Sequence, residues 1–245
     1  MFILLPPSES KASGGHLPPL RLDGLLFPHL RAARERMLAA LAAISGDLPA
    51  ARSALGVGAA QDREIADNVQ LATAPTMPAL HRYTGVLYEA VDVQRMTAAE
   101  RARADARVLI TSALFGVLGA ADAIPAYRLS AQARLPGMGS VAAVWRAPLT
   151  PLLAGLPGPV VDLRSGAYAA FAPVPGAVTV RVVSTRPDGS RAVVSHFNKA
   201  TKGRLARLLA TSRAEPRGVT DVARVARRAG MTVERIGPAA LQIVT

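Results

Sequence analysis

The chain has 245 residues, of which 50% are hydrophobic and 19% charged, so it holds enough apolar material for a core and is not expected to be disordered. It contains no cysteine, which excludes disulfides and thiolate metal sites, and its four histidines show no metal-ligand spacing, so we expect neither a metal nor another cofactor. No long uncharged apolar segment and no basic leader before the first apolar residues are present, so we expect a cytoplasmic protein without membrane contact.

The net charge of +12 is unevenly distributed. Residues 1–180 hold 16 Lys and Arg against 13 Asp and Glu, whereas residues 181–235 hold 13 against 4. Because each neutralised phosphate releases counterions, this local excess favours DNA or another phosphate-bearing ligand as partner. The alternative is a basic face that serves solubility in an arginine-rich chain.

The periodicity of apolar residues predicts strands alternating with helices, and then a hairpin and two further helices. Strands are predicted at 2–5, 107–111, 159–163, 178–184, 191–196 and 231–236, and helices at 30–45, 58–70, 97–106, 141–154, 199–212 and 219–229. Pro187-Asp188-Gly189 is typical of a turn between two of the strands. Without a repeat or a linker, the pattern predicts one domain over 1–245, of mixed α/β (α+β) class, with a mixed sheet and surrounding helices.

The first polar loop follows the N-terminal strand directly. Two prolines, Pro6 and Pro7, give the chain an extended path, after which Ser8, Ser10 and backbone amides can surround an anion, with Lys11 as a compact charge. The loop lacks the spacing of a P-loop, and the alternative is an ordinary surface loop.

Lysine is rare in this chain. Only Lys11, Lys199 and Lys202 occur among 29 basic residues, so lysine is expected where the rigid arginine fork would not serve. Lys199 and Lys202 are three residues apart and therefore share one side of the predicted helix, with Arg204 on its exposed flank.

Tyrosine stands beside arginine twice, as Arg82-Tyr83 and as Tyr127-Arg128. Such pairs can stack on a base or hold a phosphate. The alternative is a buried tyrosine whose hydroxyl is hydrogen-bonded.

Residues 133–145 resemble the hairpin of a helix-hairpin-helix element. Gly137 and Gly139 would let the backbone approach a phosphate, and the following helix would direct its amides toward it. The alternative is a helix N-terminus capped by Ser140.

The order and spacing of several segments resemble the YaaA peroxide-stress-response family (UPF0246-like). They are Pro7 to Lys11, Tyr83-Thr84-Gly85, Ser112 to Leu118, Pro125 with Tyr127 and Arg128, Trp145, Asp162 to Tyr168, and Phe197-Asn198-Lys199 with Lys202-Gly203. The resemblance implies a cytoplasmic protein that limits unincorporated iron and DNA damage under hydrogen peroxide. It also implies a basic, DNA-binding cleft lined by Lys11, Tyr83, Ser112, Tyr127, Arg128, Lys199 and Lys202.

Two functional hypotheses follow. In the first, a protein without enzymatic activity binds DNA with little sequence specificity, through Lys11, Tyr83, Arg128, Gly137, Gly139, Lys199, Lys202 and Arg204. In the second, an enzyme acts on a nucleotide or nucleobase in a lysine-centred pocket, with Lys11, Lys199, Ser112 and Tyr127 as catalytic residues. The oligomeric state is left open.

Overall fold

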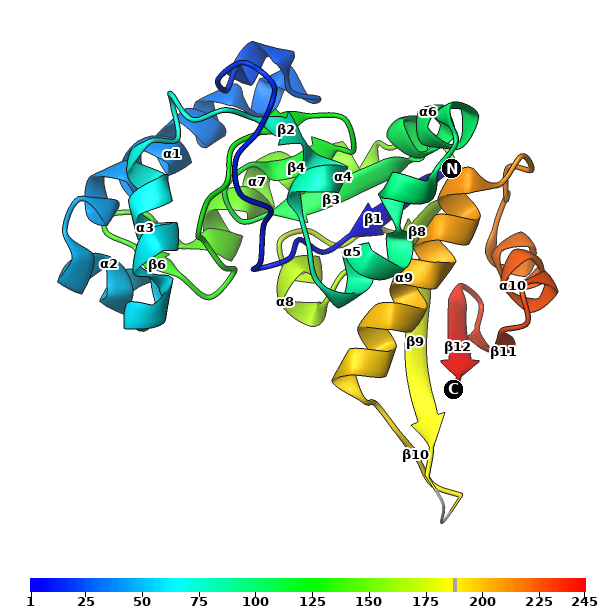
Figure 1. Ribbon diagram of the computed structural model, residues 1–245. Coiled ribbons are helices and arrows are strands. Elements are labelled where there is room, and N and C mark those ends of the chain that lie inside the picture. Colours follow the sequence, from blue (N-terminus) through cyan, green and yellow to red (C-terminus); the bar gives the residue numbers. More distant parts are fainter. Residues whose placement is uncertain (187–188) are drawn as a thin grey trace.

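The sheet of this protein is mixed, with a parallel centre and antiparallel edges. The computed structural model describes residues 1–186 and 189–245, in which eight strands form one sheet in the order β11-β12-β9-β8-β1-β3-β4, with β10 paired to β9 (Figure 1). The strands are β1 (Phe2–Leu5), β3 (Val108–Ser112), β4 (Gly116–Gly119), β8 (Val160–Asp162), β9 (Val178–Thr185), β10 (Arg191–Ala192), β11 (Thr232–Gly237) and β12 (Ala240–Val244). The mixed α/β fold predicted from the sequence is confirmed.

Strand β1 lies at the centre, parallel to β3 on one side and to β8 on the other. Ile3 is paired with Val108 and with Val161, and Ile3, Leu4 and Leu5 are completely buried. A continuous apolar segment is typical of a parallel strand covered on both faces. Strands β4 and β11 pair antiparallel with β3 and β12 and form the two edges.

Ten helices surround this sheet in the described residues. They are α1 (Arg31–Ser45), α2 (Leu48–Leu55), α3 (Asp62–Val69), α4 (Ala79–Arg82), α5 (Val86–Val91), α6 (Ala98–Arg107), α7 (Val141–Ala154), α8 (Gly166–Ala169), α9 (Ser195–Thr211) and α10 (Val219–Arg228). Figure 1 shows α1, α2 and α3 grouped at one end of the molecule, whereas α9 and α10 lie at the other end beside β9, β11 and β12. No helix in this part of the chain has both the length and the apolar character to cross a bilayer.

Helix α9 packs very closely on α5 at Gly203. A Cβ atom at this position would lie 2.2 Å from the carbonyl oxygen of Leu87 and 2.7 Å from the Cβ of Ala90. The absence of a side chain at Gly203 therefore sets how near α9 approaches the rest of the fold.

The edge strand β4 is fully buried, because α1 covers it through Arg34. The guanidinium of Arg34 donates to the carbonyl oxygens of Phe115 (3.1 Å) and Val117 (2.8 Å), and also to those of Leu26 (2.8 Å) and Phe27 (3.3 Å). Arg34 is completely buried and forms no ion pair with a described carboxylate, so four carbonyl dipoles stabilise its charge, with a further electrostatic contribution from Asp122. On the opposite face of the sheet edge, the indole of Trp145 in α7 donates to the carbonyl of Ala113 at 2.7 Å.

The structure also corrects the predicted elements in places. The strand expected at 191–196 ends at Ala192, because α9 begins at Ser195 rather than near 199. Residues 187 and 188 of the expected turn lie outside the described residues, although β9 and β10 do pair antiparallel. Four short strands complete the fold, namely β2 (Met77–Pro78) paired with β5 (Ala123–Ile124) and β6 (Arg134–Leu135) paired with β7 (Gly139–Ser140).

Candidate functional site

The strand order predicts a ligand-binding site at the carboxyl ends of β1 and β8. The chain leaves β1 toward β3 on one side, and β8 is later added on the other side of β1. Ligands of open α/β sheets typically bind at such a switch in strand order, where the loops diverge. Polar side chains gather there, and we call them the switch-point cluster: Glu9, Lys11, Tyr83, Ser112, Tyr127, Arg128 and Tyr168.

Lys11 lies in the loop that follows β1. Its backbone forms an antiparallel bridge with Tyr83, and its ammonium donates to the carbonyl oxygens of Ser8 (3.0 Å) and Glu9 (3.1 Å). The Nζ atom lies 4.2 Å from the ring centroid of Tyr127 and 5.6 Å from that of Tyr83. No described carboxylate forms an ion pair with it. The pKa of Lys11 is lowered to about 7, mainly by burial, with Glu9 acting in the opposite direction and Arg128 contributing to the decrease.

Tyr83, Tyr127 and Ser112 form a buried chain of hydroxyl groups below Lys11. The hydroxyl of Tyr127 lies 2.7 Å from that of Tyr83 and 2.8 Å from the Oγ of Ser112, which also accepts the backbone N–H of Phe115 at 3.1 Å. Burial raises the pKa of Tyr83 to about 12 and also raises that of Tyr127. The two tyrosines are 2% and 3% exposed, so they correspond to the buried, hydrogen-bonded alternative that the sequence left open. Their role in binding a base or a phosphate stays a prediction.

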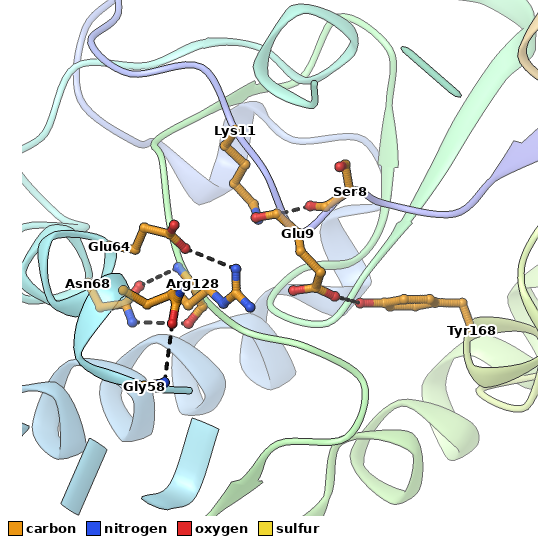
Figure 2. Close-up of polar contacts among 9 residues, drawn as sticks. Ser8, Glu9, Lys11, Gly58, Glu64, Asn68, Arg128 and Tyr168 are labelled. Carbon is orange, nitrogen blue, oxygen red and sulfur yellow. Dashed lines mark hydrogen bonds and ion pairs between the residues drawn. The ribbon is translucent and has the colours of Figure 1, made fainter. Parts of the chain in front are cut away.

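Glu9 links the loop after β1 to the loop after β8. Its Oε1 accepts a long hydrogen bond of 3.5 Å from the hydroxyl of Tyr168, as Figure 2 shows, while its Oε2 is buried and has no hydrogen-bond partner among the described residues. Sequence reasoning did not select Glu9. Its position directly after a buried strand was the available signal, but the contact with a residue 159 positions away was not visible.

Arg128 is held at the side of the cluster opposite Tyr168 (Figure 2). Its guanidinium forms an ion pair with Glu64 of α3 at 3.0 Å, and its backbone N–H and C=O bond the side chain of Asn68 at 2.8 and 3.0 Å. Helix α3 is thereby attached to the cluster, and the charge of Arg128 already has a partner.

Lys202 and Lys199 differ in their surroundings, although both lie on α9. The ammonium of Lys202 donates to the carbonyl oxygens of Leu163 (3.3 Å) and Arg164 (3.4 Å) after β8, and burial lowers its pKa. Lys199 is exposed, without a side-chain partner in the described structure. Lys11 and Lys202 thus lie at the ends of the neighbouring strands β1 and β8, and each ammonium donates to backbone carbonyl oxygens. Lys199 is exposed instead and makes no such contact among the described residues.

Below Lys202, Asp162 and Arg164 form the most enclosed ion pair of the site. The guanidinium donates to both carboxylate oxygens, at 2.9 and 2.7 Å, and its side chain is fully buried. It also donates to the carbonyls of Ala172 (3.0 Å) and Tyr168 (3.4 Å), and so orders the loop that carries Tyr168.

Arg204 lies on the exposed flank of α9, as the sequence predicted. Its guanidinium contacts the Oγ1 of Thr201 at 3.4 Å and lines a hollow of about 420 Å³, with Arg207, Gly230 and Thr232 among the other walls. The guanidinium of Arg207 donates to the carbonyl oxygen of Val91 at 2.8 Å and forms an ion pair with Asp92.

Gly137 and Gly139 are exposed, but Gly137 lies in the turn between the two short strands β6 and β7, and Gly139 is the first residue of β7. Residues 125–133 contain no helix, and α7 begins after Ser140, whose Oγ accepts the N–H of Ala143 at 3.2 Å. The capped helix start left open by the sequence is therefore present, and the helix-hairpin-helix element predicted here is not confirmed.

A pair of helices joined through two glycines occurs elsewhere. Helices α2 and α3 are connected by Gly56, Val57, Gly58 and a 3-10 turn (Ala59–Gln61), and Gly56 adopts the left-handed conformation with φ 65°. The segment Leu55-Gly56-Val57-Gly58 was the sequence signal, but the helix predicted in this region began only at residue 58, so α2 was not expected.

In the described residues, no group of three or more His, Cys, Asp or Glu side chains is placed to hold a metal ion. The side chains of the switch-point cluster supply an amine, a carboxylate, a guanidinium and hydroxyl groups.

Comparison with known proteins gives a consistent result over nearly the whole chain. A family model described as the peroxide stress protein YaaA matches residues 1–231. A UPF0246 protein of Corynebacterium efficiens is 49% identical over 238 residues, which cover 96% of this chain and 95% of that protein. A UPF0246 protein of Streptomyces coelicolor is 43% identical over 244 residues, which cover 98% of this chain and 94% of that protein.

Proposed function

This chain belongs to the YaaA family of peroxide stress proteins, and from that premise we propose that it binds DNA through the phosphate backbone with little sequence preference. Peroxide damages DNA, so a backbone-binding protein could act wherever damage occurs.

The observation that carries this proposal is the unbalanced charge of residues 181–235. The described acidic residues of this segment are already in ion pairs: Glu215 with the N-terminal amine (2.6 Å), Asp221 with Arg224 (2.7 Å) and Glu234 with Arg191 (2.6 Å). By contrast, the exposed Arg181, Lys199, Arg213 and Arg228 have no side-chain partner in the described structure. Internal pairing thus consumes the negative charge and leaves positive charge for an external polyanion.

The helices α2 and α3 supply a second candidate contact. The exposed Gly56 and Gly58 leave the connecting backbone open to close approach, and amides at the start of a helix favour a phosphate. Such contacts are made to phosphates and not to base edges, which agrees with DNA binding of little sequence preference.

The test is the salt dependence of duplex binding, measured by fluorescence anisotropy. With about 0.9 released counterions per phosphate, four contacts predict a slope of about −3.6 in a plot of log affinity against log salt concentration. The double variant Lys199→Ala, Arg213→Ala removes two of these contacts and should lower the magnitude of this slope by about 1.8.

The matched control is Arg31→Ala combined with Arg95→Ala, which removes the same charge from exposed side chains that already pair with Asp23 or Glu35 and with Asp92. This control should change the slope little. A flat salt dependence, or equal effects of the two double variants, would disprove the proposal.

A further inference from the structure

Lys11 is poorly explained by phosphate binding. It is only partly accessible, and its ammonium is directed to two carbonyl oxygens of its own loop and to the ring of Tyr127. A phosphate-binding lysine would profit from a permanent positive charge in water, whereas this one lies where its charge is costly.

The hydrogen bonds of Lys11 match a neutral amine. A neutral –NH₂ group has two N–H donors and one lone pair, and two carbonyl acceptors are present, those of Ser8 and Glu9. The third proton of the ammonium has no oxygen or nitrogen acceptor among the described residues, and the rings of Tyr127 and Tyr83 lie beside it. Loss of that proton would turn an unsatisfied donor into a nucleophilic lone pair.

Glu9 provides an open acceptor beside this amine. Its Oε2 is buried without any partner in the described part of the chain, although a buried carboxylate oxygen is rarely left unsatisfied. Tyr168 holds the other oxygen, so the carboxylate is oriented from the β8 side. A ligand hydroxyl that donates to Oε2 would supply the hydrogen bond that this oxygen lacks among the described residues.

The two tyrosine hydroxyl groups next to the amine of Lys11 carry no negative charge. Tyr83 and Tyr127 stay protonated, since burial raises the pKa of both, and the nearest arginine, Arg128, is paired with Glu64. The hydroxyl groups beside the amine are therefore neutral, and Glu9 is the neighbouring carboxylate that can accept a proton.

We propose that Lys11 is a nucleophile that condenses with the aldehyde of an open-chain sugar phosphate to form an imine, with Glu9 binding a sugar hydroxyl and relaying the proton. The aldehyde comes either from an abasic site in DNA or from a free sugar phosphate. The DNA source rests on the proposed function, whereas the free sugar does not.

The chemistry balances without an oxidant or a reductant. The lone pair of Nζ forms a C–N bond with the aldehyde carbon, while the π pair of C=O moves to oxygen. One proton passes from nitrogen to that oxygen through Glu9 and gives the carbinolamine. A further proton then lets the hydroxyl leave as water, and the nitrogen lone pair forms the C=N bond of the protonated imine.

The lowered pKa of about 7 supports this role, because roughly half of Lys11 would be the free amine at pH 7, against on the order of 1 in 2,500 for an unperturbed lysine. The groups that act on it are Glu9 and Glu64, which raise its pKa, and Arg128 and Arg82, which lower it, with Tyr83 and Tyr127 neutral beside it.

The test uses reduction by cyanoborohydride, which converts an imine into a stable amine adduct. The full chain is incubated at pH 7 with a duplex containing one abasic site or, separately, with 2-deoxyribose 5-phosphate, and the adduct is located by peptide mass mapping. With Lys11, Lys199, Lys202 and the N-terminus as the primary amines, the assignment is unambiguous. Accessibility alone favours Lys199, so we expect at least a tenfold preference for Lys11 as evidence of its reactivity.

Three variants sharpen the result. Lys11→Arg keeps the charge and should abolish the adduct, Glu9→Gln should slow its formation, and Lys199→Arg is the matched control that should not change it. Because the wild-type map alone locates the adduct, a variant that fails to fold leaves the answer intact.

An adduct at Lys11 in either arm supports the inference, and the arm identifies the source of the aldehyde. No adduct in both arms, or one spread over Lys199 and Lys202, overturns it. Anisotropy with an undamaged duplex is measured in parallel. Binding without trapping would refute the role of Lys11 alone, whereas trapping of the free sugar without duplex binding would refute the proposed function alone.

Discussion

Replacing Gly203 by alanine should loosen the contact between α9 and α5. The new Cβ would lie 2.2 Å from the Leu87 carbonyl oxygen, so the helices must separate by more than 1 Å before the contact reaches the ordinary range above 3.4 Å. Overpacking typically costs about 1–3 kcal/mol, and we take the upper value of about 3 because the obstructing atom belongs to the backbone. Alanine returns about 1 kcal/mol through its better helix propensity.

The net expectation for Gly203→Ala is a loss of about 2 kcal/mol in the free energy of unfolding, or roughly 4–8 °C in Tm for a chain of this size. Urea titration and thermal unfolding by circular dichroism measure both. The control is Gly166→Ala in α8, where a Cβ would meet nothing within 4 Å, and it should be neutral or slightly stabilising. A Gly203→Ala variant as stable as the wild type would refute the reasoning about this contact.

Two further predictions concern the charged groups of the site. The amine of Lys11 should titrate near pH 7, so its acetylation by limiting anhydride should be half-maximal near that pH, and a midpoint near 10 would contradict the described burial. Because the unfolded chain then binds more protons between about pH 7 and 10, the free energy of unfolding should rise with pH across that window, and Lys11→Met should flatten the rise. Asp162→Asn leaves the buried Arg164 without its counter-charge and should cost about 3–5 kcal/mol in urea titration, whereas Glu35→Gln, which removes an exposed partner of Arg31, should cost less than about 1 kcal/mol. Equal costs for the two would show that burial does not control the strength of these pairs.

Elements with a strong local pattern could be predicted from the sequence. The apolar run Phe2–Leu5 and the helices Val141–Ala154 and Val219–Arg228 lie where periodicity placed them. Strand β4 was missed because its four residues begin and end with glycine, and the helix α2 was hidden because the glycines after it resemble an ordinary loop. The valines at 193 and 194 favoured extending the predicted strand to residue 196, but α9 already begins at Ser195.

For the site, the rarity of lysine singled out Lys11, and the tyrosine-arginine pairs singled out Tyr83, Tyr127 and Arg128. The sequence could not show that the tyrosine hydroxyls bond one another, nor that Glu9 reaches Tyr168. The pairing of β2 with β5 brings the segments that carry Tyr83 and Tyr127 together. The contact of Glu9 with Tyr168 depends on strand order, which places the loops after β1 and β8 side by side although 159 residues separate the two side chains.

The way Arg34 covers strand β4 has a consequence for self-association. An outermost strand normally offers its free carbonyl groups to a neighbouring chain, which is how sheets fuse into larger aggregates. Here the guanidinium already occupies the oxygens of Phe115 and Val117, so a foreign strand could not use these two acceptors without first displacing a buried cation. This margin of the sheet is thereby closed to fibril growth by one side chain, without an additional strand or a proline.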